Sequence, residues 1–390
     1  MYLSDILNIL NIESSIDDFK INSIKIDSRE VSNNDIFITI NTGYKYIKDA
    51  LDKGCNLVIS DHEYDDNRVI KVDNTILVLG SIAKYIRSLY KGVVIAITGS
   101  CGKTTSKELL TYILSSKYKV LSTKDNLNNN IGVPSTLLNL DNSYDYVVLE
   151  LGTNHKGEIK YLSDIVKPNI SIITNIGYSH IGNFNSTYDI LKEKLDIGGL
   201  LFLNGSDHLL NKESGIKVYS NDYTYECSIP FYKMNYYLVF KVLEYLGFNI
   251  NEVYEIIKDY KVYNSRMDIY EFNNITLIDD TYNASFESVV SGLKSLNKYS
   301  RKLVILSDML ELGNKSIKLH SKLKEYLVDC DLITIGNYTS ILNGYNHFNN
   351  IKDLTNYIVT INYNNYDVVY IKGAHKYKLN TIVNIIKNIL

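Results

Sequence analysis

Residues 98–105 read T-G-S-C-G-K-T-T and carry the clearest chemical pattern in the chain. They follow an apolar run that predicts a strand and precede a segment with helical spacing, which is the context that a phosphate-binding loop requires. Glycines in such a turn let backbone N–H groups approach phosphate oxygens, and the helix N-terminus adds the positive end of its dipole. We therefore expect this loop to bind the tail of a nucleoside triphosphate. An ordinary glycine turn before a helix is the alternative.

The side chains of the loop have distinct roles in this interpretation. Lys103 supplies a movable cation for the terminal phosphates, and Thr104 supplies a hydroxyl group to Mg²⁺. The stricter G-x-x-x-x-G-K-[ST] pattern is not met, because Ile97 stands where its first glycine belongs. The residues that we expect to contact ATP in this loop are Gly99, Ser100, Cys101, Gly102, Lys103, Thr104 and Thr105.

Two further candidates follow predicted strands. Glu150 ends the apolar run 146–151, and open parallel sheets bind their ligands at the carboxyl ends of strands. A carboxylate there is suited to hold Mg²⁺ against the phosphates, and a solvated strand-end glutamate is the alternative. His180 comes four residues after the run 170–176. Its spacing alone fits a hydrogen-bonded loop histidine at least as well as a metal ligand.

A third group lies in the last third of the chain. Asp280, Tyr282 and Asn283 come at the end of a predicted strand. A tyrosine ring packs well on adenine and an asparagine amide can hydrogen-bond its edge, so we expect these residues to hold the nucleotide base. Asp308 follows another predicted strand in the same manner, and a carboxylate that caps a turn or helix is its alternative role.

Alternating apolar runs and helix-length segments predict an α/β fold around these residues. Buried parallel strands are predicted at 93–98, 146–151 and 170–176. A second doubly wound, Rossmann-like sheet is predicted from the runs 275–280, 302–308, 332–336 and 368–373, which alternate with helical stretches near 286–296 and 316–328.

The first ninety residues predict a small α/β domain with strands near 36–40 and 56–60 and a helix that ends at Gly54. We expect three domains: residues 1–90, a central ATP-binding phosphate-loop domain at 91–268, and a C-terminal Rossmann-like domain at 269–390. These limits precede fresh series of strands and helices, and boundaries are the least secure product of such patterns.

Composition excludes several classes of protein. Forty-one Lys and Arg against 44 Asp and Glu give a net charge of -3, with no run of like charges, which disfavours nucleic-acid binding. No apolar stretch approaches the roughly 18 residues of a membrane span, and no basic leader opens the chain, so we expect a cytoplasmic protein. The four cysteines form no CxxC pair, which argues against a disulfide framework or a structural zinc site. We expect a monomer.

Several motifs resemble, in the same order, those of the Mur ligases, which are ATP-dependent enzymes that join an amino acid or dipeptide to a nucleotide-linked carboxylate. The matching segments are TGSCGKTT, DNLNNNIGVPSTLL (125–138), LELGTNHKGEI (149–159), ITNIGYSHIGNF (173–184), SRMDIY (265–270), IDDTYNASFES (278–288) and SDMLELG (307–313). Within the family, DxYNA and DMLELG look most like the ligase that adds D-alanyl-D-alanine to UDP-N-acetylmuramoyl-tripeptide in peptidoglycan precursor synthesis.

The resemblance implies roles for metal and nucleotide residues. It makes Glu150 a ligand of Mg²⁺ and His180 a ligand of a second Mg²⁺. It also implies a lysine that CO₂ converts into an anionic carbamate, and the matching position is Lys194. Lys192 is near enough to leave the register open, and a solvated helix face explains both lysines about as well. Arg266 matches a residue that contacts ATP from across the hinge.

The resemblance also implies residues that bind the two other substrates, a nucleotide-sugar peptide and a dipeptide or amino acid. Asn-rich turns are common, so a structural role is the alternative for Asn126, Asn128 and Asn129. DSREVSNNDIFITI (27–40) is similar to the family's UDP-sugar-binding domain. The residues implied are Ser28, Arg29, Asn126, Asn128, Asn129, Asp308 and Lys372.

Departures from the family pattern leave alternatives open. The K-G-S-R of the family appears as Lys372-Gly373-Ala374-His375, residues 43–47 lack Asp-Gly-His, and the stretch 204–266 is short. A Mur-type ligase with altered substrates and a catalytically silent nucleotide-binding paralogue are therefore the competing hypotheses. Folylpolyglutamate synthetase is a more distant relative, which DxYNA and DMLELG disfavour.

Overall fold

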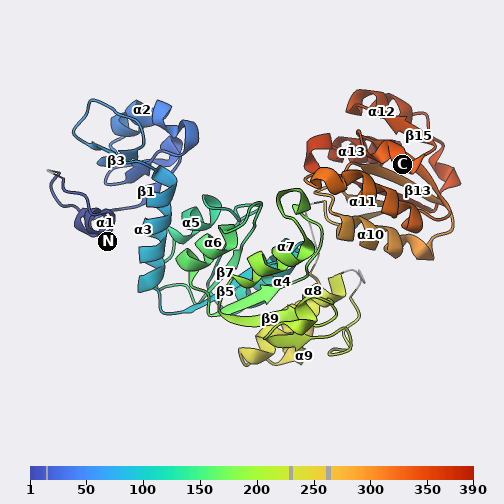
Figure 1. Ribbon diagram of the computed structural model, residues 1–390, viewed down its shortest axis with the longest axis horizontal. Coiled ribbons are helices and arrows are strands. Elements are labelled where there is room, and N and C mark those ends of the chain that lie inside the picture. Colours follow the sequence, from blue (N-terminus) through green and yellow to red (C-terminus); the bar gives the residue numbers. More distant parts are fainter. Residues whose placement is uncertain (15, 228–231, 261–264) are drawn as a thin grey trace.

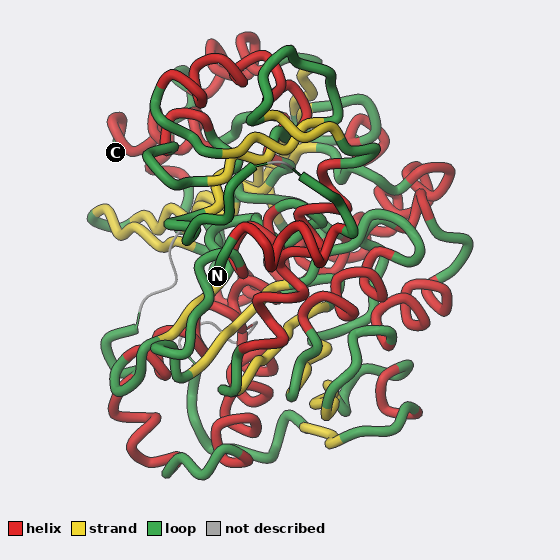
Figure 2. The backbone as a smooth tube through the Cα atoms, turned by 90° about the vertical axis from the view of Figure 1, so that its left-hand side faces the viewer, coloured by secondary structure: helices red, strands yellow, loops and turns green. Residues whose placement is uncertain are grey.

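The molecule is built around three β-sheets that succeed one another along the chain (Figure 1). The computed structural model describes residues 1–14, 16–227, 232–260 and 265–390. One sheet has four strands and the other two have six each, within these described residues. Helices flank the strands, as the turned view of Figure 2 shows. The predicted α/β architecture is confirmed.

The first sheet is parallel throughout, in the order β1-β2-β3-β4. Short apolar strands such as IFI are fully buried, which is typical of parallel strands covered on both faces. Its elements are α1 (Leu3–Leu10), β1 (Ile24–Lys25), β2 (Ile36–Ile38), α2 (Ile47–Asp52), β3 (Leu57–Ser60), β4 (Val69–Lys71) and α3 (Thr75–Leu89).

The middle sheet is also parallel, in the order β10-β9-β8-β5-β7-β6. Its central strand β5 lies between β7 and β8, so the carboxyl ends of these three strands meet at one edge. Its strands are β5 (Val93–Thr98), β6 (Val120–Ser122), β7 (Tyr146–Glu150), β8 (Ile170–Ile173), β9 (Leu200–Asn204) and β10 (Ile216–Val218). Its helices are α4 (Lys103–Ser115), α5 (Gly132–Leu137), α6 (Glu158–Val166), α7 (Thr187–Leu195), α8 (Lys233–Tyr245) and α9 (Ile250–Ile256).

The third sheet is mixed, in the order β11-β12-β16-β13-β14-β15, and only the β11–β12 pair is antiparallel. Its strands are β11 (Asp268–Phe272), β12 (Ile275–Asp280), β13 (Lys302–Ser307), β14 (Cys330–Ile335), β15 (Asn346–Phe348) and β16 (Val368–Lys372). Its helices are α10 (Phe286–Ser295), α11 (Ser316–Lys322), α12 (Ile351–Ile358) and α13 (Asn380–Ile389).

The four strands predicted for this sheet all form. The β11–β12 hairpin was not predicted. Strand β11 alternates between half-buried and exposed residues and carries no apolar run, so its sequence gives no strand signal.

Helix α3 joins the first sheet to the middle one. It packs against α1 on one side and against α5 and α6 on the other. The guanidinium of the buried Arg87 donates from Nε to the carbonyl of Val166 (2.7 Å) and from Nη2 to that of Lys167 (2.8 Å), both at the carboxyl end of α6. Helix α3 therefore packs against helices of both the first and the middle sheet. The domain limits at 90 and 268 stay predictions.

Within the described part of the chain, every helix is too short or too polar to cross a lipid bilayer.

The Arg87 contacts generate a test of the packing between the first two sheets. Arg87→Met keeps the apolar stem but leaves buried carbonyl oxygens without donors, so we expect the free energy of unfolding to fall by about 1–3 kcal/mol. Arg68→Met is the control, because the guanidinium of the half-buried Arg68 pairs locally with Asp66, two residues before it, and we expect the substitution to change stability by at most about 0.5 kcal/mol. Urea titration followed by circular dichroism measures both, and equal effects would contradict this account of α3.

Candidate active site

A cavity of about 900 Å³ lies between the carboxyl ends of the middle and third sheets. It brings together most of the residues singled out in the sequence, although these come from segments as far apart as Ser100 and Lys372. Those that line it are Ser100, Cys101, Gly102, Lys103, Thr104, Thr105, Asn126, Asn128, Asn129, Glu150, His180, Arg266, Asp280, Tyr282, Asn283 and Lys372. Ser28, Arg29, Gly99, Lys194 and Asp308 do not line it.

The phosphate loop connects β5 to α4, and two glycines let it turn. Gly102 has φ +82° and is the N-cap of α4, and a Cβ there would lie 2.5 Å from the Asn235 side chain. A Cβ at Gly99 would overlap the hydroxyl of Thr174. Because the first N–H groups of a helix have no acceptor inside the helix, the start of α4 presents donors to the cavity.

Residues after β8 hold the loop from behind. The Thr174 hydroxyl donates to the carbonyl of Cys101 (2.5 Å), and the Asn175 side chain accepts from the Cys101 N–H (2.9 Å). The Asn175 carbonyl accepts from the N–H of Ser100 (3.0 Å). These contacts fix the loop backbone before any ligand arrives.

A buried carboxylate faces the loop. Glu150, at the end of β7, is 2% exposed, and its two oxygens accept from the Thr104 hydroxyl (2.7 Å) and from the Asn128 amide (2.8 Å). The ammonium of Lys103 donates to the carbonyl of Gly99 (2.7 Å). A hydroxyl and a carboxylate side by side next to a phosphate loop form the kind of hard oxygen donor set that Mg²⁺ prefers.

His180 lies where the middle part of the molecule meets the third. It has φ +60°, and its Nδ1 contacts the carboxylate of Glu311, which comes from the third part. The hydrogen bond to His180 lowers the pKa of Glu311. The N–H of Gly182 donates to the backbone carbonyl of Glu311 (2.9 Å). Among the described residues, no three His, Cys, Asp or Glu side chains gather as a ready-made metal site.

Lys194 and Lys192 differ sharply in environment. Lys194 is 2% exposed, and within the described chain no residue forms a hydrogen bond or ion pair with its amine. Burial, together with the charge of Lys103, lowers the pKa of Lys194 well below its usual value. Lys192 is exposed and lies over the ring of Tyr188. Lys194 is therefore the buried lysine of the two, and Lys192 is the solvated one.

Another part of the cavity lining comes from the third sheet and the turn before it. The guanidinium of Arg266 lies 3.8 Å from the ring centroid of Tyr282, in a cation–π contact. Arg266 stands between Ser265 and Met267, both with positive φ, so the backbone turns sharply just before β11. Asn283 is exposed to the cavity, although its Oδ1 accepts from the N–H of Ala284 (2.8 Å).

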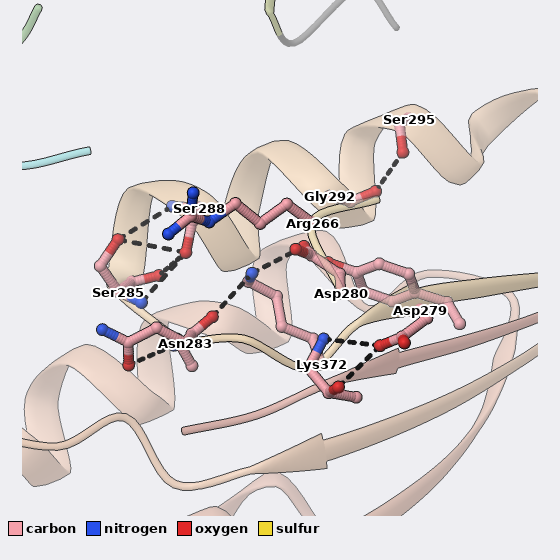
Figure 3. Close-up of polar contacts among 12 residues, drawn as sticks. Arg266, Asp279, Asp280, Asn283, Ser285, Ser288, Gly292, Ser295 and Lys372 are labelled. Carbon is pink, nitrogen blue, oxygen red and sulfur yellow. Dashed lines mark hydrogen bonds and ion pairs between the residues drawn. The ribbon is translucent and has the colours of Figure 1, made fainter. Parts of the chain in front are cut away.

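Asp280 and Lys372 form a buried ion pair across neighbouring strands (Figure 3). They are register partners in β12 and β16, and the Lys372 ammonium lies 2.6 Å from Oδ2 of Asp280. It also donates to the carbonyl of Asn283 (3.0 Å), and the Tyr370 hydroxyl donates to the same Asp280 oxygen (2.9 Å). The charge of Lys372 is therefore neutralised inside the protein, and its structural role is to fix the turn that carries Asn283.

Two predicted residues have mainly structural partners. The carboxylate of Asp308 is 1% exposed and accepts from the backbone N–H groups of 337–339 (2.7–2.9 Å) and from the Tyr377 hydroxyl (2.8 Å). This is the turn-capping alternative rather than a cleft-facing role. Asn129 accepts from the N–H groups of Ile131 and Gly132 and so caps the turn into α5.

The remaining predicted substrate residues lie apart or in solvent. Arg29 is exposed and its guanidinium pairs with Asp27. Ser28 is buried, with its carbonyl bound by Lys53 (2.8 Å). Asn126 is exposed at the cavity rim.

Sequence reasoning missed the residues that support the site. Thr174, Asn175 and Glu311 were not singled out, although the motifs ITNIGYSHIGNF and DMLELG contain them. The signal available was their position close after strands, since Thr174 and Asn175 directly follow β8 and Glu311 comes four residues after β13. His375 and Lys376 also line the cavity.

Two protein-family models match the chain. The Mur ligase middle domain covers residues 97–225, and the Mur ligase glutamate ligase domain covers residues 265–375. A UDP-N-acetylmuramoyl-tripeptide--D-alanyl-D-alanine ligase of Buchnera aphidicola subsp. Acyrthosiphon pisum is 31% identical, over 94% of this chain and 93% of the relative. The enzyme of the same name from Rickettsia prowazekii is 29% identical, over 93% of this chain and 94% of the relative.

Solved structures share the fold over nearly the whole chain. MurF from Acinetobacter baumannii superposes with a TM-score of 0.86 at 23% identity, covering 98% of this chain and 97% of that one. MurF ligase from Thermotoga maritima in complex with ADP gives a TM-score of 0.83 at 21% identity, covering 93% and 96%. With the relative of 31% identity matched almost from end to end, the chain belongs to the Mur ligase family.

Proposed function

We propose that this protein is the ATP-dependent ligase that joins D-alanyl-D-alanine to UDP-N-acetylmuramoyl-tripeptide, with release of ADP and phosphate. The observation that carries the proposal is the Thr104–Glu150 pair beside the phosphate loop, in one cavity with Arg266 and Tyr282. The names of the relatives support the choice of substrates. We expect the enzyme to act as a monomer in the cytoplasm.

The reaction needs activation of a carboxylate, because a carboxylate resists attack by an amine and oxide is a poor leaving group. A carboxylate oxygen of the tripeptide attacks the γ-phosphorus of ATP, an O–P bond forms, and the bond between the γ-phosphorus and the bridging oxygen breaks to give ADP. The amine of the dipeptide then attacks the acyl carbon. The tetrahedral intermediate expels phosphate, and the amine loses a proton to give the amide.

In this reaction a carboxylate anion approaches the polyanionic triphosphate, and the phosphate loop supplies groups that reduce their repulsion. Lys103 and the N–H groups at the start of α4 donate to the phosphate oxygens. The oxygen donors of Thr104 and Glu150 fit Mg²⁺, and these residues would hold it. The ion, when bound, offsets the negative charge of the phosphates.

The nucleoside is held from the third sheet. The Tyr282 ring, backed by Arg266, offers a face for adenine, and Asn283 offers an amide for its edge. Phosphate-binding and base-binding residues thus come from different domains, so docking of the third domain completes the site and excludes water. Exclusion of water matters because water would hydrolyse the acyl phosphate.

Lys194 is suited to carry the carbamate. Burial lowers the pKa of Lys194, which favours the neutral amine, and the nitrogen lone pair of a neutral amine can attack CO₂, form an N–C bond and release a proton. The resulting anion and His180 would hold a second Mg²⁺ near the acceptor carboxylate. Glu311, which contacts His180, would add a further carboxylate beside this second Mg²⁺.

The substrate-binding residues stay proposals. Asn126 at the cavity rim and Asn128 beside Glu150 would contact the acceptor, while Asn129 shapes the turn beside them. Ser28 and Arg29 would contact the UDP-sugar from the first domain. Lys372 would act through the turn at Asn283 rather than by direct contact, because its charge is paired.

A ligase with a different amine substrate is the second candidate. The specific observation in its favour is the segment 374–376, where Ala374, His375 and Lys376 line the cavity in place of the family's Ser-Arg. Phosphate release with ATP, Mg²⁺ and a panel of acceptor and amine substrates separates the hypotheses. We expect release with UDP-N-acetylmuramoyl-tripeptide and D-alanyl-D-alanine. Release only with another pair favours the altered ligase, and release with none favours a silent paralogue.

The phosphate-loop assignment is tested by Lys103→Ala. Removal of a charge that acts on the transferring phosphoryl group should raise the barrier by about 2.7–4 kcal/mol, so we expect turnover to fall by roughly 100- to 1,000-fold. Lys315→Ala serves as the control, because this half-buried lysine lies outside the cavity. Turnover of the Lys103 variant within about threefold of the parent would show the assignment to be wrong.

The carbamate is tested by comparing two lysines of the same helix. Lys194→Ala should abolish most turnover, and added formate or acetate should restore part of it by supplying the missing carboxylate. Lys192→Ala, two residues away and exposed, should change turnover by less than about twofold. Carbon-13 NMR of the parent in labelled bicarbonate should show one carbamate signal that Lys194→Ala loses. A folded Lys194 variant that keeps this signal, or that no carboxylate rescues, would count against the carbamate.

A further inference from the structure

Three successive backbone N–H groups after β8 donate to side chains from three separate segments of the chain. Ile176 donates to Oδ2 of Asp207 (2.8 Å), in the turn after β9. Gly177 donates to the hydroxyl of Ser100 (2.8 Å), in the phosphate loop. Tyr178 donates to Oε1 of Glu287 (2.6 Å), in the first turn of α10 and thus in the third domain. This short segment, 176–178, therefore connects the third domain to the phosphate loop.

Glu287 fits closely against this segment. Its carboxylate lies over Gly177, where any Cβ would overlap it. Its Oε2 is out of contact with solvent, and no described residue donates a hydrogen bond to that atom. The neighbouring Phe286 packs edge-on against the Tyr178 ring, with centroids 5.6 Å apart. The contact combines a partly buried hydrogen bond with close packing, so it has a defined geometry.

The segment contacts the phosphate loop at Ser100 from two sides. The Ser100 hydroxyl accepts from Gly177, and the Ser100 carbonyl accepts from the hydroxyl of Ser179 (2.9 Å). Ser100 itself lines the cavity. A shift of residues 177–179 would therefore move the backbone that faces the phosphates.

We propose that Glu287 is a positioning residue, which fixes the phosphate loop through the 176–178 segment when the third domain is docked. The nucleotide is then gripped tightly only in the docked arrangement. This inference rests on the proposed function, because it requires a nucleotide at residues 99–105. Loss of the Glu287 contact weakens nucleotide binding although Glu287 does not line the cavity.

The chemistry of the carboxyl group predicts which substitution preserves the contact. Burial, and to a lesser degree the nearby charge of Asp207, raises the pKa of Glu287, while the N–H of Tyr178 opposes the shift. The hydrogen bond that joins the two segments is accepted by Oε1 of Glu287, so an acceptor oxygen at this position is what the contact requires. Glutamine keeps that oxygen, whereas alanine leaves the N–H of Tyr178 without an acceptor.

The chain offers a matched control for docking itself. Lys315 also reaches from the third domain to the middle one, where its ammonium donates to the carbonyl of Asn185 (3.1 Å). Within the described chain, Asn185 forms no hydrogen bond with the phosphate loop. Lys315→Ala thus removes a contact between the domains without touching segment 176–178.

The test measures binding of Mg²⁺-ADP by calorimetry, together with kcat and KM for ATP. We expect Glu287→Ala to raise the dissociation constant for ADP and KM for ATP by roughly tenfold. Glu287→Gln and Lys315→Ala should stay within about twofold of the parent. An effect of Glu287→Ala no larger than that of Lys315→Ala, or a glutamine variant as weak as the alanine variant, overturns the inference.

A second variant protects the test against a folding defect at position 287. Gly177 does not use a positive φ, so alanine suits its backbone, yet the added Cβ must displace the Glu287 carboxylate. We expect Gly177→Ala to weaken ADP binding as Glu287→Ala does. The double variant should be hardly weaker than either single one, because both remove the same contact. Additive losses contradict the inference. If the parent protein itself binds no ADP, the proposed function fails, whereas the outcomes above concern Glu287 alone.

Discussion

The buried charge at the carboxyl ends of β5 and β7 is the constraint on which the rest of the site depends. Glu150 is almost fully removed from water, and a buried carboxylate is tolerated only when its oxygens have donors. Thr104 and Asn128 supply them, one from the phosphate loop and one from the loop after β6. The same two oxygens are suited to a divalent cation. The fold therefore keeps a costly negative charge directly beside a loop that is built to receive phosphates.

The cavity is lined by residues from two domains, the middle one and the third. The middle sheet provides the phosphate loop and Glu150, whereas the third sheet provides Arg266 and Tyr282. The contacts of Glu311 with His180 and of Glu287 with Tyr178 hold the two parts together. Both contacts use residues that follow β8. The same stretch of chain therefore contacts the phosphate loop on one side and the third domain on the other. Such coupling suits a reaction whose acyl phosphate must be kept from water.

Local patterns predicted what depends on local chemistry. The apolar runs located the main strands, and the glycine and lysine pattern located the phosphate loop, because strand burial and loop turns are encoded within a few residues. The β11 strand was missed because its side chains alternate in exposure without an apolar run. The partners of Asp308 and Lys372 were out of reach, since Asp308 caps a turn 29 residues away and Lys372 pairs with a carboxylate 92 residues away. The choice between Lys192 and Lys194 likewise required burial, which the sequence alone left open.

A crystal structure of the protein with Mg²⁺ and ADP tests the central claim most directly, because that claim concerns where one ligand lies. We expect the β-phosphate oxygens to accept from the N–H groups at the start of α4, with Lys103 turned from Gly99 toward them. Mg²⁺ should lie beside Thr104, on the side of Glu150, and adenine should lie against Tyr282. A nucleotide bound outside this cavity, or bound with its phosphates away from Lys103, would contradict the account.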